Sequence, residues 1–177
     1  MSYAITSAYK QIKALKKPIR VIQGGTSAGK TIAILMYLID YATRHESKLI
    51  TVASINHPHL RRGALRDIVN IFTENNYWNY YKIIHNKSES TFTFFNGSVI
   101  EFVALDEGKA RGSRRDVLFV NEANLISYEV FDQLDVRTRD FSIVDYNPTS
   151  EFWAHTELVA KRDDVDFIIL TYKDNEA

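Results

Sequence analysis

Residues 21–31 read VIQGGTSAGKT, in which an apolar segment runs directly into the pattern Gly-x-x-x-x-Gly-Lys-Thr. Glycines let backbone amides approach a phosphate closely, and the N-terminus of a following helix favours its negative charge. In such a loop the lysine reaches the β- and γ-phosphates and the threonine hydroxyl reaches Mg²⁺. The stretch therefore predicts a strand, a nucleotide-binding loop and a helix. The predicted nucleotide-binding residues are Gly24, Gly25, Thr26, Ser27, Ala28, Gly29, Lys30 and Thr31.

The residues after this loop support that interpretation. Ile32, Leu35, Met36 and Ile39 recur at helical spacing, so the loop opens a helix with one apolar face. A plain glycine-rich turn would not require this context. We therefore expect a nucleoside triphosphate such as ATP, together with Mg²⁺, as ligands, with Thr31 at the metal.

Composition limits the remaining possibilities. The chain has 177 residues, of which 45% are hydrophobic, which predicts a single domain over residues 1–177 with one substantial core. Its 22 basic residues balance 22 acidic ones, so any surface for nucleic acid must be a local patch. The absence of cysteine excludes disulfides, thiolate metal sites and cysteine nucleophiles. The longest apolar run, residues 32–39, is too short to cross a membrane.

The order of apolar segments predicts an α/β fold. Strands are expected at residues 19–23, 48–54, 116–121, 141–145 and 166–171, and helices at 2–16, 59–74 and near 127–134. Residues 91–95 and 98–104 flank Asn96-Gly97, which predicts a hairpin with a two-residue turn as an insertion or edge element. The pattern indicates a central, mainly parallel sheet covered by helices on both faces.

A second group of polar residues follows the predicted strand at 116–121. Glu122 is the candidate general base, because a carboxylate at this end of a parallel sheet can deprotonate water in line with the γ-phosphate. Asn121 stands where an aspartate usually holds the hydration shell of Mg²⁺. Its amide can contact a metal-bound water but lacks the charge. Asn121 is compatible with weaker metal affinity or with lost activity, but the charged Glu122 next to it favours an active enzyme.

Arginines are the third expected component, because a guanidinium can neutralise charge that develops on the γ-phosphate. Arg111 lies in a basic loop before the strand at 116–121 and is the first candidate, with a solvated charge or a DNA phosphate contact as the alternative. Arg137 and Arg139 are weaker candidates. Arg61 and Arg62 fit a contact to the phosphates of a nucleic acid or of a partner, or simple exposure.

Two further groups have candidate roles. Asn147 and Thr149 follow the strand at 141–145, next to Glu122 if the strands are neighbours, and could sense the γ-phosphate or form an ordinary turn. Tyr9 and Gln11 could contact the adenine base or lie on a helix surface. The histidines show no spacing typical of metal ligands.

Five motifs occur in a distinctive order: GGTSAGKT (24–31), NGSVIEFVALDEGKARG (96–112), LFVNEAN (118–124), DYNPTSEFW (145–153) and TYKDNEA (171–177). With them the chain resembles the N-terminal ATPase domain of the tailed-bacteriophage large terminase subunit over nearly its whole length. The resemblance implies a P-loop ATPase of the additional-strand, catalytic-glutamate type that drives DNA packaging. It implies roles for Lys30 and Thr31 at phosphate and Mg²⁺, Glu122 in catalysis, Arg111 as a finger acting in a neighbouring subunit, and Asn147 and Thr149 in coupling.

The resemblance also implies partners. These are double-stranded DNA, the portal protein, the small terminase subunit and further copies of the chain in a ring, in the cytoplasm of an infected bacterium. The isolated domain is expected to be monomeric. Large terminases typically continue into a nuclease domain; here residues 172–177 resemble the start of the linker to it, so no DNA cleavage is expected.

Two positions depart from the family pattern. Thr26 stands where many relatives carry an arginine, and Asn121 stands where they carry an aspartate. If Asn121 weakens the metal site enough, the chain would be a nucleotide-binding regulatory module with little hydrolysis. A small-molecule kinase is disfavoured because no arginine-rich lid segment occurs between the predicted strands.

Overall fold

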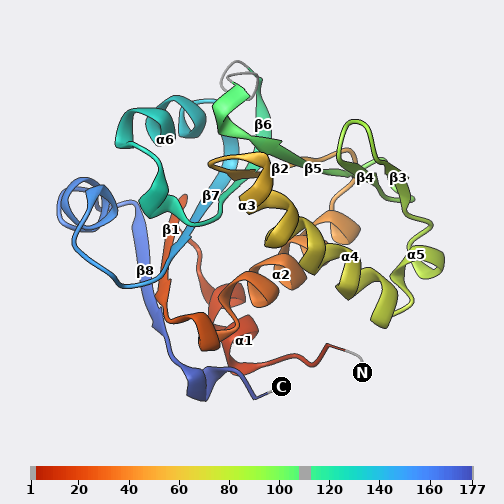
Figure 1. Ribbon diagram of the computed structural model, residues 1–177, viewed down its shortest axis with the longest axis horizontal. Coiled ribbons are helices and arrows are strands. Elements are labelled where there is room, and N and C mark those ends of the chain that lie inside the picture. Colours follow the sequence, from red (N-terminus) through yellow and green to blue (C-terminus); the bar gives the residue numbers. More distant parts are fainter. Residues whose placement is uncertain (1–2, 108–112, 177) are drawn as a thin grey trace.

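A computed structural model describes residues 3–107 and 113–176 (Figure 1). Within them an eight-stranded sheet has the order β3-β4-β5-β2-β6-β7-β1-β8. Six strands, from β5 to β8 in this order, run parallel, and β4 and β3 continue the sheet antiparallel. The bounds are β1 Ile19–Gly24, β2 Leu49–Ser54, β3 Ile84–Asn86, β4 Thr91–Thr93, β5 Val99–Ala104, β6 Arg115–Val120, β7 Thr138–Tyr146 and β8 Val165–Leu170. The predicted mainly parallel sheet is confirmed.

Helices cover both faces of this sheet, as predicted. The helices are α1 Ser7–Ala14, α2 Lys30–Arg44, α3 His57–Arg62, α4 Ala64–Glu74, α5 Tyr77–Tyr80 and α6 Tyr128–Asp135, with a π-helical turn at Ala154–Val159. Figure 1 shows α2 and α4 on one side of the sheet and α6 on the other. None of the helices in the described part of the chain is long and apolar enough to cross a membrane.

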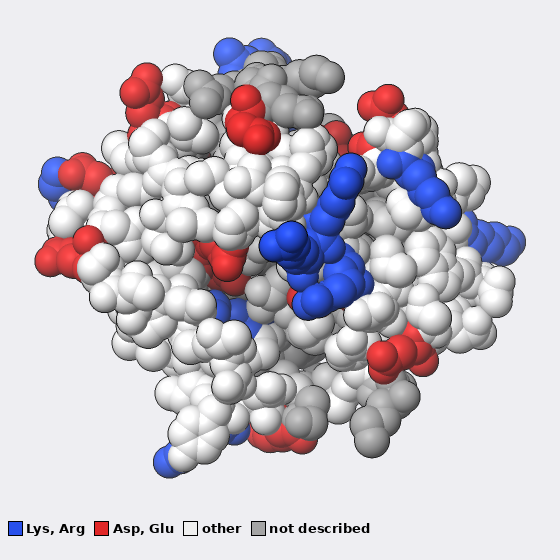
Figure 2. Space-filling model, viewed as in Figure 1, with Lys and Arg blue, Asp and Glu red and all other residues white. Residues whose placement is uncertain are grey.

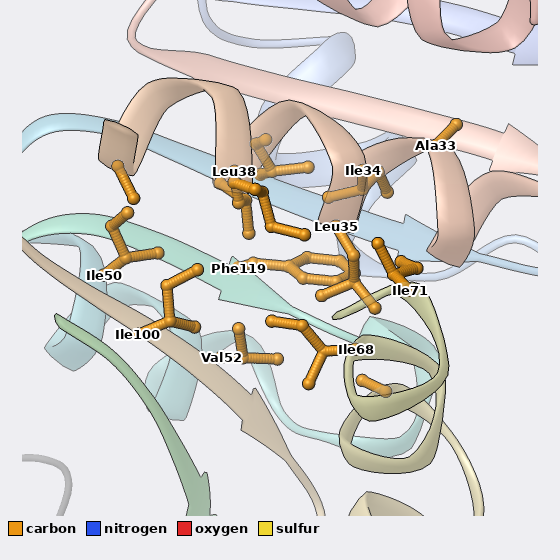
Figure 3. Close-up of a cluster of buried hydrophobic side chains, with 14 of the residues drawn as sticks. Ala33, Ile34, Leu35, Leu38, Ile50, Val52, Ile68, Ile71, Ile100 and Phe119 are labelled. Atoms are coloured by element: carbon orange, nitrogen blue, oxygen red, sulfur yellow. The ribbon is translucent and has the colours of Figure 1, made fainter. Parts of the chain in front are cut away.

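Two buried clusters explain this layering. On one face, residues of α2 and α4 pack against alternate residues of the strands, as Leu35, Ile68, Val52 and Phe119 do in Figure 3. On the other face, Phe131 of α6 and the residues Ala154 and Leu158 contact the strand residues of opposite parity. Because strand side chains alternate between faces, the apolar runs bury both sides of the sheet.

The strand order decides where functional residues meet. β7 lies between β1, which leads into the phosphate loop, and β6, which leads to Glu122. All three strands are parallel, so their carboxyl ends open at the same edge of the sheet. β7 is therefore the additional strand expected from the resemblance.

Two predictions about helices were wrong. The first helix spans Ser7–Ala14 only, because the Thr6 side chain caps it by accepting from the N–H of Tyr9. The helix expected at 59–74 is two helices: Asn56 caps α3 by accepting from the N–H of His59, and Gly63 leaves the helical region before α4.

The hairpin also differs from expectation in its turn. The N–H of Gly97 donates to the carbonyl of Phe94, and the N–H of Phe94 donates to the carbonyl of Ser98, so the loop has three residues. Gly97 has the positive φ of 80° that closes such a loop. The strand after it, β5, pairs with β2 and belongs to the main sheet, whereas β4 and β3 extend the edge.

Candidate active site

The phosphate loop joins β1 to α2 through a short turn at Thr26–Ala28. Two of its glycines are required by the geometry. A Cβ on Gly24 would lie 2.6 Å from the carbonyl oxygen of Leu170 in β8, and Gly29 has a φ of 67°. Gly29 caps α2, so the loop ends at the N-terminus of a fifteen-residue helix. This end of a helix favours an anion.

Lys30 is buried at the bottom of this loop, with 6% of its surface exposed. Its Nζ donates to the carbonyl oxygen of Gly25 at 3.3 Å and to Oδ1 of Asn147 at 2.8 Å. Burial lowers the pKa of the Lys30 ammonium, and the charges of Asp145 and Glu122 oppose that shift. Both oxygens that accept from this buried ammonium are neutral, so a phosphate can replace them.

Asp145 is the acidic residue that the sequence analysis did not select. It ends the apolar part of β7 and is 2% exposed. Its Oδ1 accepts from Nδ2 of Asn121 at 3.0 Å and from the backbone N–H of Glu122 at 2.8 Å. Burial raises the pKa of the Asp145 carboxyl, while Lys30 and these hydrogen bonds lower it. The sequence did contain a signal for Asp145, because it is a charged residue directly after the apolar run of a predicted strand.

Glu122 follows β6 in a left-handed conformation, with φ 56° and ψ 55°. Such a conformation is uncommon for a residue other than glycine and occurs often at functional sites. Its Oε2 lies 2.9 Å from Nδ1 of His59 at the beginning of α3, and 43% of its side chain is exposed. Glu122 therefore faces solvent and α3 while its backbone is held by Asp145.

These residues surround one cavity of about 460 Å³. Its lining includes Lys30, Thr31, Asn121, Glu122, Asp145, Asn147, and, from α3 and α4, His59, Arg62 and Arg66. This volume lies within the range of small-molecule sites. The carboxyl ends of β1, β6 and β7 thus supply polar groups of both charges to a single hollow.

The structure places other predicted residues away from this cavity. Thr149 lines a separate hollow with Gln23 and His155. Arg137 and Arg139 lie where β7 begins, and they line a separate cavity there. The candidate site is at the other end of this strand. Arg61 is exposed on α3. Arg111 lies outside the described residues.

The two candidates for the adenine base are engaged elsewhere. Tyr9 is buried in the core beside α2, and Nε2 of Gln11 donates to Oδ1 of Asp174 at 2.7 Å. The segment that contains Asp174 also reaches the phosphate loop, because Nδ2 of Asn175 donates to the carbonyl of Ser27 at 3.2 Å. The residues expected to begin a linker are therefore packed against α1 and the loop.

The donor set fits a magnesium–nucleotide complex. Magnesium prefers hydroxyl and carboxylate oxygens together with phosphate oxygens. Thr31 and Asp145 present such oxygens on the wall that also carries Lys30.

No family model matches the chain, and no curated protein matches it. Solved structures match it closely in fold. The large terminase of a thermophilic bacteriophage has a TM-score of 0.81 at 17% identity, over 98% of this chain and 47% of that one. The large terminase ATPase domain of Thermus phage P74-26 has a TM-score of 0.73 at 11% identity, over 92% of this chain and 79% of that one. The chain has the fold of a phage large-terminase ATPase domain.

This terminase ATPase fold is a P-loop fold, so the predicted fold class is confirmed. The large terminase of the same thermophilic phage, in complex with ATP-γ-S, matches with a TM-score of 0.79 at 18% identity, over 97% of this chain and 46% of that one. The chain therefore spans about half the length of the large terminases of that phage.

Proposed function

We propose that this chain binds and hydrolyses ATP with Mg²⁺, and that it is the motor domain of a large terminase that moves double-stranded DNA into a procapsid. One observation carries the proposal. Lys30 and Thr31 of the phosphate loop line the same cavity as Glu122, Asp145 and Asn147, although the chain reaches them from three different strands. The large-terminase fold supports the connection to DNA packaging.

Each of these residues has a distinct role in the proposed reaction. Lys30 exchanges Asn147 and Gly25 for oxygens of the β- and γ-phosphates, and Thr31 directs its hydroxyl to the metal. Bound Mg²⁺ supplies positive charge to the phosphate oxygens. Glu122 orients the attacking water and accepts its proton. Asn147 loses its bond from Lys30 when phosphate is present, so it can report the state of the nucleotide to β7.

In the same proposal the site is completed by a second copy of the chain. Arg111 of a neighbouring subunit would enter the cavity as a finger, in a ring assembled on the portal protein with the small terminase subunit. The ring would act in the cytoplasm of the infected bacterium. A trans-acting finger predicts that the turnover of each subunit rises with protein concentration and falls in Arg111→Ala.

The test compares Glu122→Gln and Lys30→Ala with wild type in ATP-binding and phosphate-release assays across protein concentrations. Glu122→Gln removes the proposed base and should reduce kcat by about 10²-fold or more while ATP binding is retained. Lys30→Ala removes the buried ammonium and should weaken ATP binding about tenfold or more, because a charge-assisted hydrogen bond to the phosphates is lost. Glu129→Gln on α6 and Lys13→Ala on α1 are matched controls outside the cavity.

Two outcomes would contradict hydrolysis by Glu122. Retained turnover in Glu122→Gln would exclude it as the base. Tight ATP binding by wild type without turnover, at every concentration and with portal protein present, would instead support the regulatory module that Asn121 suggested.

A further inference from the structure

β7, the strand between β1 and β6, carries a buried carboxylate to which the proposed reaction gives no role of its own. Asp145 is the next-to-last residue of β7 and the most buried acidic residue of the cavity lining, with 2% of its surface exposed. A buried carboxylate is costly unless hydrogen bonds or a cation compensate for it. The residues that contact the Asp145 carboxylate therefore indicate its role.

The two carboxylate oxygens of Asp145 face different partners. Oδ1 is held by Nδ2 of Asn121 and by the backbone N–H of Glu122, at 3.0 and 2.8 Å. Oδ2 accepts from Oγ1 of Thr31 at 3.3 Å. A threonine hydroxyl that donates its single proton to a carboxylate keeps both lone pairs for a cation. The contact therefore orients Thr31 as a metal ligand.

We infer that Asp145 supplies the carboxylate of the magnesium site, in place of the aspartate expected at position 121. The inference rests on the proposed function and specifies which residue holds the metal side of that site. Asp145 fixes the Thr31 hydroxyl and places negative charge beside it, at the edge of the cavity that the phosphates would enter. Asn121 is a positioning residue that orients Asp145.

The amide at position 121 follows from this arrangement. Asn121 is 5% exposed and directs its nitrogen, a donor, at Asp145. An aspartate at position 121 would place two carboxylates in hydrogen-bond contact in a buried site, where like charges repel strongly. The pair requires one donor and one acceptor, and these can be exchanged between β6 and β7. Asn121 then supports the metal site by orienting Asp145, and its presence does not mean that the metal site has been lost.

The test measures metal-dependent nucleotide binding, which does not depend on hydrolysis. ADP affinity is determined by calorimetry with Mg²⁺ and with EDTA, and Mn²⁺ bound together with ADP is counted by electron paramagnetic resonance. Wild type should bind ADP more tightly with the metal. Asp145→Asn should lose that gain by about 10- to 100-fold and lose the Mn²⁺ signal, while ADP binding in EDTA is retained.

The double variant N121D/D145N moves the carboxylate to position 121, the residue after β6, and reverses the hydrogen bond. It should regain the metal-dependent affinity that Asp145→Asn lacks, and it carries the test if Asp145→Asn does not fold by circular dichroism. Asp135→Asn is the matched control, because Asp135 is a carboxylate outside the cavity lining that accepts from Ser142 in the middle of β7. This control should retain the full gain from the metal.

The outcomes separate the two proposals. Wild-type gain from the metal in Asp145→Asn would overturn the inference, and so would a folded double variant that binds ADP without any gain. Wild type that binds ADP equally with and without metal would overturn it as well. Wild type that binds neither ADP nor ATP would contradict the proposed function itself.

Discussion

At the scale of single residues, the contact between His59 and Glu122 gives the proposed base a partner. Nδ1 of His59 lies 2.9 Å from Oε2 of Glu122, across a sequence separation of 63 residues. A general base acts best when a third group orients it. His59 lies in the first turn of α3, in the cavity lining, and is anchored there because Asn56 accepts from its backbone N–H. We interpret His59 as the group that positions Glu122.

We therefore expect His59→Ala to reduce kcat for ATP hydrolysis about tenfold and to leave KM unchanged, because a hydrogen bond to a charged group is lost while the phosphate contacts remain. Steady-state kinetics at saturating and limiting ATP separate the two parameters. His45→Ala, at the far end of α2, is the control. Equal kcat values for wild type and His59→Ala would show that the contact does not position the base.

At the scale of elements, the spacing between β1 and β8 depends on Gly24. A Cβ at this position would lie 2.6 Å from the backbone oxygen of Leu170, which cannot move without displacing β8. At Gly25, the next residue, a Cβ would meet nothing within 4 Å. The two adjacent glycines therefore differ: the packing of β1 against β8 requires a glycine at position 24 but not at position 25.

Gly24→Ala should lower the free energy of unfolding by about 1–3 kcal/mol, because the added methyl group overpacks the junction of two strands. Gly25→Ala should stay within about 0.5 kcal/mol of wild type. Urea unfolding followed by circular dichroism measures both. Equal midpoints for the two variants would mean that β8 yields at Leu170 without cost.

At the scale of the whole molecule, a balanced net charge conceals an uneven surface. Figure 2 shows basic side chains gathered over α3 and the beginning of α4, the segment that contains Arg61, Arg62 and Arg66. Arg62 and Arg66 line the cavity beside the phosphate loop, whereas Arg61 is exposed outside that lining. One short helix thus presents positive charge both to the cavity and to solvent, where a DNA backbone could bind.

Arg61→Ala should weaken the binding of double-stranded DNA and reduce the slope of log affinity against log salt by about 0.9, the value for one phosphate contact. Its ATP affinity should be unchanged. Fluorescence anisotropy over a series of salt concentrations gives the slope, and Lys10→Ala on α1 removes the same charge elsewhere. If both variants give the same slope, Arg61 does not contact the DNA.

The sequence by itself determined the features that are local along the chain. The phosphate loop is one contiguous motif, and the strands are short apolar runs whose burial on both faces follows from their composition. These patterns predicted the α/β class, the parallel sheet and the position of Glu122 at the end of β6. Local exceptions such as the break at Gly63 depend on single residues and weaken pattern-based prediction at those points.

Only the tertiary structure decided which distant residues meet. Thr31 and Asp145 are 114 positions apart and come together because β7 pairs between β1 and β6. The apolar strands resemble one another in sequence, so nothing local specifies their order in the sheet. Because of that order, Asn121, whose missing charge suggested a weaker metal site, is the hydrogen-bond partner of a carboxylate on β7. Strand pairing is a long-range choice, made by packing the whole core.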